Sequence, residues 1–358
     1  MPAQETIFLT GFPGFIAVRL IKELARGGAQ FLLLVENKDK PLAGAREAIA
    51  RLVEETGVGA EHFQIVKGDI TREHLGMDDA EFEMACGETT MLFHLAALYD
   101  LGVKPEPARQ VNVEGTRKVN EFARACRRLG RYHYVSTCYV AGLREGLIRE
   151  DELAHTAGFR NFYEQTKYLA ELEVEQLKDV LPVTIHRPAV VCGDSRSGET
   201  SKYDGIYYLI KYLRMWPALL SQVNIGNRDV RLNIVPVDFV VEAMAALARD
   251  EGAVGATVQL ADPRPLTTHD LFETIAESLV GHGSRLSLPK WMVRASLSLP
   301  LAEKVTQLPR TGAPYFFIKQ TYDTSRADAL LAPHGISCPP FPSYVGALID
   351  YVARHPRL

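Results

Sequence analysis

Thr10-Gly11-Phe12-Pro13-Gly14-Phe15-Ile16-Ala17 follows a short apolar run and opens a helical pattern. A glycine turn between a strand and a helix is the context that a phosphate-binding fingerprint requires. Gly11 permits the tight turn, Gly14 lets the backbone approach a pyrophosphate, and the small Ala17 lets the helix pack on a sheet. The helix N-terminus would then face the phosphate charge. A strand-turn-helix without a ligand is the alternative interpretation, because the spacing is GxxGxxA instead of GxGxxG.

Apolar runs alternate with helical patterns along the first half of the chain. We expect strands at Thr6–Leu9, Phe31–Val35, Phe63–Val66, Met91–Leu95, Tyr132–Ser136 and Val183–His186. We expect helices at Phe15–Arg26, Ala43–Glu55, Asp78–Cys86, Pro107–Leu129 and Tyr163–Leu177. This alternation predicts parallel βαβ units with helices on both faces of one sheet.

Beyond Gly193 the pattern loosens, and Gly, Pro and aromatic residues gather. Helical patterns remain at Val237–Arg249 and His269–Val280. We therefore predict an α/β fold: a Rossmann-type doubly wound parallel sheet with a smaller C-terminal substrate lobe. Residues 1–192 would form the dinucleotide-binding core, joined by returning elements near 224–262. Residues 193–358 would form mainly the substrate-binding lobe.

Composition excludes several classes of protein. The 358 residues carry a net charge of −4, so no global field favours nucleic acid. Five cysteines lie far apart without a CxxC pair, which disfavours a disulfide framework or a zinc site and favours a reducing compartment. The ten histidines show no metal-ligand spacing, and no run of 18 apolar residues predicts a membrane span. Because the N-terminus also lacks the pattern of a signal peptide, we expect a cytoplasmic protein without a metal.

Tyr163 and Lys167 lie four residues apart in a run of strong helix formers. Residues at this spacing share a helix face, so the phenol and the ammonium can point at one spot. A nearby cation favours the phenolate and makes the phenol a better acid at neutral pH. Such a pair suits acid/base work on a carbonyl or an alcohol. A surface tyrosine and a solvated lysine at chance spacing are the alternative.

Glu36 follows the second expected strand, about 20 residues after the glycines. A carboxylate at this position can accept hydrogen bonds from the hydroxyls of an adenosine ribose, and it would repel a 2′-phosphate. Glu36 therefore favours NAD(H) over NADP(H), although Lys38 is close enough to weaken the inference.

Several motifs follow one another in a recognisable order. They are TGxxGF at 10–15, Gly68-Asp69-Ile70, His94-Leu95-Ala96-Ala97, Asn112-Val113-Glu114-Gly115-Thr116, Val135-Ser136-Thr137 and Tyr163-x-x-x-Lys167. Together they resemble the extended short-chain dehydrogenase/reductase family over nearly the whole chain. One branch fits best, because residues 193–200 (GDSRSGET), followed by Asp204, are similar to the GDSxTG segment of thioester reductases and fatty acyl-CoA reductases. That branch commonly carries Arg after the second strand, where this chain has Glu36, so the cofactor is NAD(H) or NADP(H).

The resemblance implies roles for individual residues. Thr137 would be the catalytic hydroxyl, Tyr163 the acid/base and Lys167 its helper. Asn112 would brace the active-site helix, and Ser136 would be a second hydroxyl donor or a strand-end residue. The residues implied in cofactor binding are Gly11, Phe12, Gly14, Phe15, Ile16, Glu36, Asp69, Ile70, Ala96, Ala97, Asn112, Ser136, Tyr163, Lys167, Pro188 and Val190.

The implied reaction is hydride transfer from a reduced nicotinamide to an acyl thioester, either an acyl-CoA or a carrier-bound acyl group. A hydroxysteroid-type dehydrogenase and a nucleotide-sugar epimerase or dehydratase are alternatives of the same fold. The latter would use charged groups such as Arg214, Arg228 and Arg231 for a diphosphate. A non-catalytic dinucleotide-sensing protein is a further alternative.

Some features keep two interpretations. Five aromatic residues either line an acyl channel or pack as an ordinary helix: Tyr203, Tyr207, Tyr208, Tyr212 and Trp216. Cys138 is a packed thiol in preference to a nucleophile. The apolar segment Trp291–Leu301 suits a lobe core, or peripheral contact with a membrane or lipid tail. A homodimer through the long helices is a family expectation only.

Overall fold

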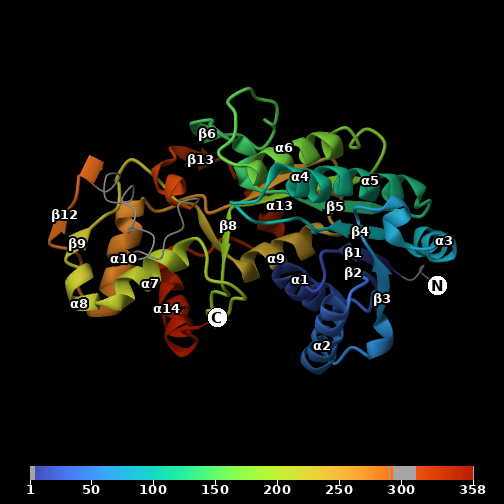
Figure 1. Cartoon of the computed structure of the whole chain (residues 1–358), viewed down its shortest axis with the longest axis horizontal. Coiled ribbons are helices and arrows are strands. Elements are labelled where there is room, and N and C mark those ends of the chain that lie inside the picture. Colours follow the sequence, from blue (N-terminus) through green and yellow to red (C-terminus); the bar gives the residue numbers. More distant parts are fainter. Residues whose placement is uncertain (1–4, 290, 293–311, 358) are drawn as a thin grey trace.

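A seven-stranded parallel sheet forms the centre of the computed structural model, which describes residues 5–289, 291–292 and 312–357 (Figure 1). The strand order is β11-β7-β5-β4-β1-β2-β3, and every neighbouring pair is parallel. The strands are β1 (Thr6–Thr10), β2 (Gln30–Glu36), β3 (Phe63–Gly68), β4 (Met91–His94), β5 (Arg131–Val135), β7 (Val183–Pro188) and β11 (Thr257–Leu260). The predicted α/β class and its six predicted strands are confirmed. The seventh strand, β11, falls in the region expected to return to the core.

Helices cover both faces of this sheet, as the alternating pattern predicted (Figure 1). One face packs α1 (Phe15–Ala25), α2 (Asp39–Thr56), α9 (Val237–Leu247) and α13 (Ser325–Leu331). The other face packs α3 (Asp79–Glu88), α5 (Gly115–Ala125) and α6 (Phe162–Glu175). Strands such as β1 are buried throughout because both of their faces meet a helical layer, which explains their continuous apolar sequence.

The long helix predicted at Pro107–Leu129 is interrupted. The structure has a short helix, α4 (Pro105–Ala108), then a π-helical turn at Arg109–Glu114, and then α5, which ends before Cys126. Isolated π-helical turns inside helices are frequent at functional sites. Here the turn carries Asn112, whose side chain reaches two other segments near the site.

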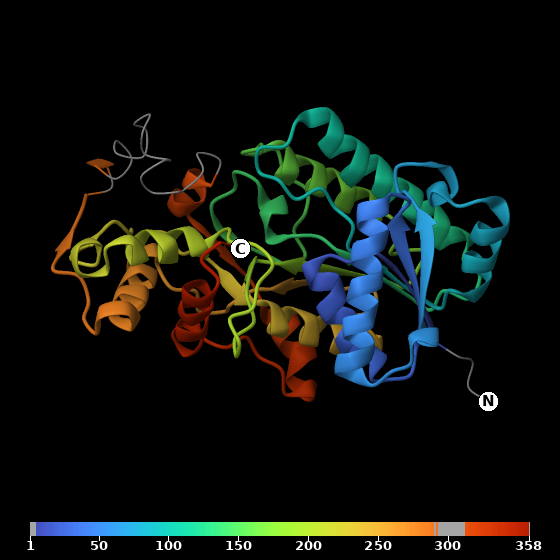
Figure 2. The same cartoon turned by 60° about the horizontal axis from the view of Figure 1, so that its bottom comes forward.

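A second group of elements lies beyond the edge of the sheet that carries β11 (Figures 1 and 2). Its apolar core joins α7 (Ile206–Met215), α10 (Thr268–Val280) and α14 (Val345–Arg354). Two-stranded sheets connect it: β8 (Val190–Cys192) with β10 (Ile234–Pro236), β9 (Val223–Asn224) with β12 (Leu286–Ser287), and β6 (Gly146–Ile148) with β13 (Gln320–Tyr322). The predicted boundary at residue 192 stays a prediction.

Two expectations concern membranes. In the described ranges, none of the helices combines the length and the hydropathy needed to cross a bilayer. Of the apolar segment Trp291–Leu301, only Trp291 and Met292 belong to the described residues, and both are exposed.

The strand order reverses between β1 and β4, which makes this point a topological switch. In open α/β sheets, ligands bind outside the carboxyl ends of the strands at such a switch. The glycine turn leaves β1 at this edge, and the segment Leu95–Ala97 leaves β4 there. The fold therefore places the two predicted cofactor-binding segments next to each other.

Candidate active site

A cavity of about 870 Å³ opens at this switch point. All predicted site residues except Asn112 line it. They are Gly11, Phe12, Gly14, Phe15, Ile16, Glu36, Asp69, Ile70, Ala96, Ala97, Ser136, Thr137, Tyr163, Lys167, Pro188 and Val190. One continuous cleft thus joins the glycine turn to the Tyr–Lys pair.

The glycine turn fits a bound pyrophosphate. Gly11 has a φ of +91°, and a Cβ there would lie 2.8 Å from the backbone nitrogen of Ala96. The Gly14 amide donates to the Gly11 carbonyl at 2.8 Å, and a Cβ on Gly14 would collide with that same oxygen. The first turn of α1 contains no acidic residue, and no side chain caps it. Its amides are therefore available to an anion in the cleft.

The far end of the cleft carries two carboxylates that suit the adenosine part of a dinucleotide. Glu36 ends β2, is exposed, and forms an ion pair with Lys38. Asp69 follows β3, and its Oδ1 accepts from the amide and the hydroxyl of Thr71 at 2.9 and 2.7 Å. Both carboxylates line the cleft, and their part in cofactor binding stays a prediction.

The three predicted catalytic residues gather at the centre of the cleft. Thr137 follows β5, and Tyr163 and Lys167 project from the first two turns of α6, which Asn161 caps by accepting from the Glu164 amide at 2.9 Å. Burial raises the pKa of Tyr163, and a hydrogen bond with Thr137 acts in the opposite direction. The hydroxyl and the phenol are thus neighbours, as a shared interaction with one substrate oxygen requires.

Lys167 differs from its sequence-based description. Its Nζ donates to the Tyr134 hydroxyl at 2.9 Å and to the Val135 carbonyl at 2.8 Å. Burial lowers the pKa of Lys167 to about 7, while the charge of Glu171 opposes this shift. The expectation that Lys167 lowers the pKa of Tyr163 is not met, because burial dominates both groups and favours the neutral form of each.

A buried ion pair lies behind the site, and sequence reasoning missed it. Arg187 at the end of β7 contacts Glu171 of α6, with Nη2–Oε1 at 2.6 Å and Nε–Oε1 at 2.8 Å; the side chains are 1% and 0% exposed. Ser136 donates its hydroxyl to the other oxygen, Glu171 Oε2. Ser136 therefore orients a carboxylate behind the cleft. The available signal was the helix spacing of four residues from Lys167 to Glu171.

Asn112 contacts the active-site helix and is not among the residues that line the cleft, and its part in cofactor binding stays a prediction. Its Nδ2 donates to the Thr166 hydroxyl on α6 at 3.0 Å. Its Oδ1 accepts from the Leu98 amide at 2.7 Å. Asn112 thus ties α6 to the segment that follows β4.

A second buried carboxylate stands beside Tyr163. Glu164 is 0% exposed, lies 3.3 Å from Arg160 Nη1, and accepts from the Tyr315 hydroxyl at 2.6 Å. Asn161 Nδ2 also donates to the Tyr315 hydroxyl at 2.8 Å. Tyr315 is another residue that sequence reasoning missed, because 151 positions separate it from Glu164 and no local pattern marks it.

Aromatic and charged groups line the cleft beside Tyr163. The Tyr99 ring meets the Tyr163 ring edge-on, with centroids 5.1 Å apart. Lys202 Nζ lies 5.1 Å from the centroid of Tyr99 and 3.5 Å from Asp204 Oδ2. Burial raises the pKa of Asp204. Among the five aromatic residues of the expected channel or helix, Tyr208 lines the cleft, whereas Tyr203 and Tyr207 pack in the core beside it and Trp216 is exposed.

Cys138 packs as the sequence analysis favoured, and His94 is buried as well. The Cys138 thiol is buried against the Arg187 carbonyl at 3.1 Å, and burial raises its pKa, so it is a poor nucleophile. His94 lies between the hydroxyls of Thr10 and Thr116 at 2.7 and 3.0 Å, and burial lowers its pKa to about 3. Within the ranges that the structure describes, no group of three or more potential ligands could hold a metal ion.

The chain is similar to several known proteins. A family model described as male sterility protein, an NAD-binding family, matches residues 9–244. Glycine betaine reductase ATRR of Emericella nidulans is 29% identical over 292 residues, which is 76% of this chain and 22% of the relative. Fatty acyl-CoA reductase wat of Drosophila melanogaster is 28% identical over 281 residues, covering 69% and 54% of the two chains. This chain therefore spans about a fifth and about half of the length of these two relatives.

Among solved structures, the terminal R domain from the myxalamid PKS-NRPS biosynthetic pathway superposes with a TM-score of 0.83 at 27% identity. The match covers 100% of this chain and 92% of that domain. The predicted nicotinamide dinucleotide cofactor agrees with the family model, whereas the choice between NAD and NADP is a separate question.

Proposed function

The chain belongs to the male sterility protein family of NAD-binding domains, an NAD(P)-dependent branch of the extended short-chain dehydrogenases/reductases, and from this premise we propose that it reduces an acyl thioester. The product would be an aldehyde or, after a second reduction, an alcohol. The fatty acyl-CoA reductase and the R domain among its relatives support this substrate class. An acyl-CoA or an acyl group on a carrier protein would bring the thioester.

One observation carries the proposal. Thr137 and Tyr163 line the same cavity as the glycine turn, and the Thr137 hydroxyl is near enough to the phenol to act against the rise in the pKa of Tyr163. A carbonyl oxygen placed between their hydroxyls would receive two hydrogen bonds while a dinucleotide occupied the remainder of the cleft. Removing one such donor typically costs a factor of about 10² to 10³ in rate.

The protein side of the reaction follows from these groups. A bound reduced nicotinamide supplies the hydride. Thr137 and Tyr163 donate hydrogen bonds to the thioester oxygen as negative charge develops there, and Tyr163 transfers its proton to it. The resulting hemithioacetal loses the thiol and leaves an aldehyde. Lys167 holds the Tyr134 hydroxyl and the end of β5, and so fixes the backbone that presents Thr137.

The choice of cofactor is a second part of the proposal. Glu36 ends β2 at the adenosine end of the cleft, and its carboxylate favours the two ribose hydroxyls of NADH over the 2′-phosphate of NADPH. Glu36 forms an ion pair with Lys38, so the Glu36→Arg variant would place two cations where a 2′-phosphate would bind. This variant should shift the preference toward NADPH. The readout is the ratio of kcat/KM values for the two dinucleotides.

The test of the reaction is dinucleotide oxidation with medium-chain and long-chain acyl-CoAs and with the matching aldehydes. NADH and NADPH are compared in parallel, and the wild type is compared with Tyr163→Phe. Thioester-dependent oxidation that is lost in the variant supports the proposal. Turnover of aldehydes or ketones without any thioester turnover refutes it and leaves a carbonyl reductase. Turnover of hydroxysteroids or nucleotide sugars, without turnover of thioesters, would support one of the alternative enzymes. Tight dinucleotide binding without turnover of any substrate would support the non-catalytic sensing protein. The cytoplasmic location and the homodimer stay predictions.

A further inference from the structure

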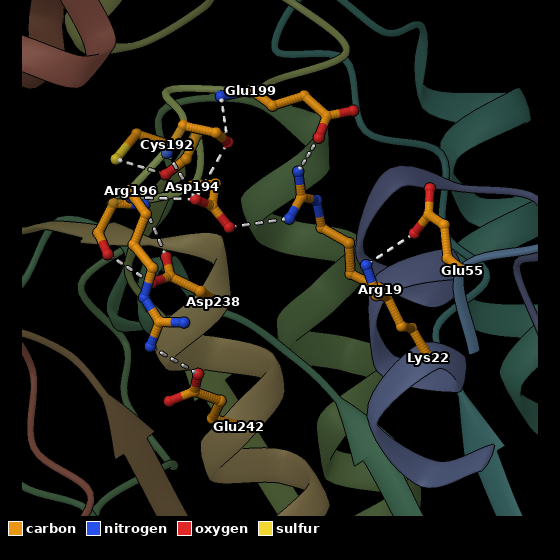
Figure 3. Close-up of polar contacts among 12 residues, drawn as sticks. Arg19, Lys22, Glu55, Cys192, Asp194, Arg196, Glu199, Asp238 and Glu242 are labelled. Carbon is orange, nitrogen blue, oxygen red and sulfur yellow. Dashed lines mark hydrogen bonds and ion pairs between the residues drawn. The ribbon is translucent and has the colours of Figure 1, made fainter. Parts of the chain in front are cut away.

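The segment 193–200, which carries the GDSxTG resemblance, folds into a loop closed by its own hydrogen bonds (Figure 3). Asp194 Oδ1 accepts from the Arg196 amide at 3.0 Å and from the amide and hydroxyl of Ser197 at 2.9 and 3.1 Å. The Asp194 amide donates to the Glu199 carbonyl at 3.0 Å. One oxygen of Asp194 therefore shapes the loop, and the other is free to bind outside it.

That second oxygen binds the helix that begins at the glycine turn. Arg19 of α1 places Nη1 at 3.0 Å from Asp194 Oδ2 and Nη2 at 2.7 Å from Glu199 Oε2 (Figure 3). The opposite side of the loop binds α9, where Asp238 accepts from the amide and hydroxyl of Ser195. The loop is thus held between two helices of the sheet domain.

Charge and burial favour a lasting contact at Arg19. The Arg19 and Asp194 side chains are only 19% and 16% exposed, so solvent screens this pair less than an ordinary surface pair. Burial acts to raise the pKa of Asp194, but hydrogen bonds from Ser197 and Arg196 and the charge of Arg19 bring it below its ordinary value. The carboxylate is therefore ionised at neutral pH. A planar guanidinium can hold two carboxylates at once, which a lysine ammonium does less well.

This contact joins the two ends of the cleft. On one side, the Arg19 guanidinium lies 5.0 Å from the ring centroid of Phe15, which lines the phosphate-binding end. On the other side, the loop leads directly into Thr200, Ser201, Lys202 and Asp204, which line the substrate side. A single side chain thus contacts both the start of α1 and the loop before the substrate wall.

We propose that Arg19 is a positioning residue that clamps loop 193–200 to α1, so that a dinucleotide bound at the glycine turn orders the substrate wall at 200–204. The two binding events are then energetically coupled through a contact that touches neither ligand. The assignment of residues 200–204 to the substrate side rests on the proposed function. The clamp itself rests on the contacts of Arg19.

Amide hydrogen exchange with and without dinucleotide tests the clamp and needs no turnover. Arg19→Gln removes the guanidinium, and Arg19→Lys keeps the charge without the fork. Lys22→Gln is the matched control, because Lys22 lies one turn further along α1 and pairs with Glu55 of α2 at 2.7 Å, away from the loop (Figure 3). Should Arg19→Gln fail to fold, Glu199→Gln removes one arm of the clamp and leaves Asp194 in place.

Saturating NADH, or NADPH, should slow exchange at residues 11–17 and also at 194–205 in the wild type and in Lys22→Gln. In Arg19→Gln the protection at 11–17 should remain and the protection at 194–205 should be lost, with an intermediate result for Arg19→Lys. Protection confined to residues 11–17 in the wild type, or unchanged coupling in Arg19→Gln, would overturn the clamp and leave the proposed function intact. No protection anywhere would overturn both.

Steady-state kinetics with decanoyl-CoA give a second readout. Loss of the clamp should raise the KM for the thioester roughly tenfold in Arg19→Gln, which corresponds to about 1.4 kcal/mol, with kcat much less affected. A merely structural contact would lower the melting temperature without this split between KM and kcat. Equal KM values in the wild type and Arg19→Gln would refute the positioning role.

Discussion

The buried pair Arg187–Glu171 gives the sharpest test of how the site is built. Glu171→Gln removes the charge while keeping the size of the side chain. Arg187 then loses its counter-ion at a position where it is 1% exposed, and only neutral acceptors remain, among them the carbonyls of Glu150 and Glu152 at 3.3 and 3.4 Å from Nη1. Ser136 loses a charged acceptor for its hydroxyl. The variant therefore leaves an uncompensated charge between β7 and α6.

The size of the effect can be worked out. Breaking a buried ion pair by removing one partner costs about 3 to 5 kcal/mol. The entropy of unfolding is about 2.1 cal/mol/K per residue, or roughly 0.75 kcal/mol/K for the whole chain. The ratio of these quantities gives a fall in melting temperature of roughly 4 to 7 °C.

Thermal unfolding followed by circular dichroism measures this fall for Glu171→Gln, Arg187→Met and the double variant. The double variant should lose less than the sum of the single losses, because it removes both charges together. Asp151→Asn is the control, since the pair Arg149–Asp151 is 57% exposed on each side and should contribute at most about 1 kcal/mol. A melting temperature for Glu171→Gln within about 1 °C of the wild type, or strictly additive losses, would refute the reasoning.

Three further predictions follow from burial and backbone geometry. Burial lowers the pKa values of three histidines: those of His94 and His133 to about 3, and that of His186 well below its ordinary value. Below about pH 6.5 the unfolded chain therefore binds more protons than the folded chain. The free energy of unfolding should fall by roughly 4 kcal/mol when the pH is lowered from about 7.5 to about 5.5. Urea unfolding at the two pH values measures this fall, which should be smaller in His133→Gln. Gly11→Ala should weaken dinucleotide binding at least about 100-fold in a fluorescence titration, because the φ of +91° at Gly11 and the 2.8 Å approach to Ala96 exclude a Cβ. Gly87 has open space around it, so the control Gly87→Ala should leave binding unchanged. Asn112→Ala should lower the free energy of unfolding by about 1 to 3 kcal/mol in the same urea assay, since it leaves the Leu98 amide without its acceptor.

The features that sequence predicted well are local ones. The glycine turn, the alternating strands and the spacing from Tyr163 to Lys167 each occupy a few consecutive residues, so backbone geometry fixes their arrangement. Of the residues that the ordered family motifs implied, all except Asn112 line the cleft. The interruption at Arg109–Glu114 was missed because Asn112 bonds two distant segments there, an arrangement that helix propensity does not encode.

The electrostatics of the site were harder to predict, because burial is a property of the whole fold. Spacing alone put the Lys167 ammonium toward the Tyr163 phenol, but the structure gives its hydrogen bonds to Tyr134 and Val135. Burial then shifts the pKa of Tyr163 upward and that of Lys167 downward. The spacing of four residues from Lys167 marks Glu171, but it does not show that Glu171 is fully buried whereas Glu173 and Glu175 of the same helix are half-buried.

The residues that do chemistry in the proposed reaction all come from the first half of the chain, yet the second half holds them in place. Tyr315 binds Glu164 next to Tyr163, and Arg187 anchors Glu171 one turn beyond Lys167. The Asp194 loop binds α1 through Arg19. The contacts Tyr315–Glu164 and Arg19–Asp194 both cross the predicted boundary at residue 192. Residues from the later part of the chain, Tyr315 and Asp194, therefore help to position the helices that carry the predicted site residues.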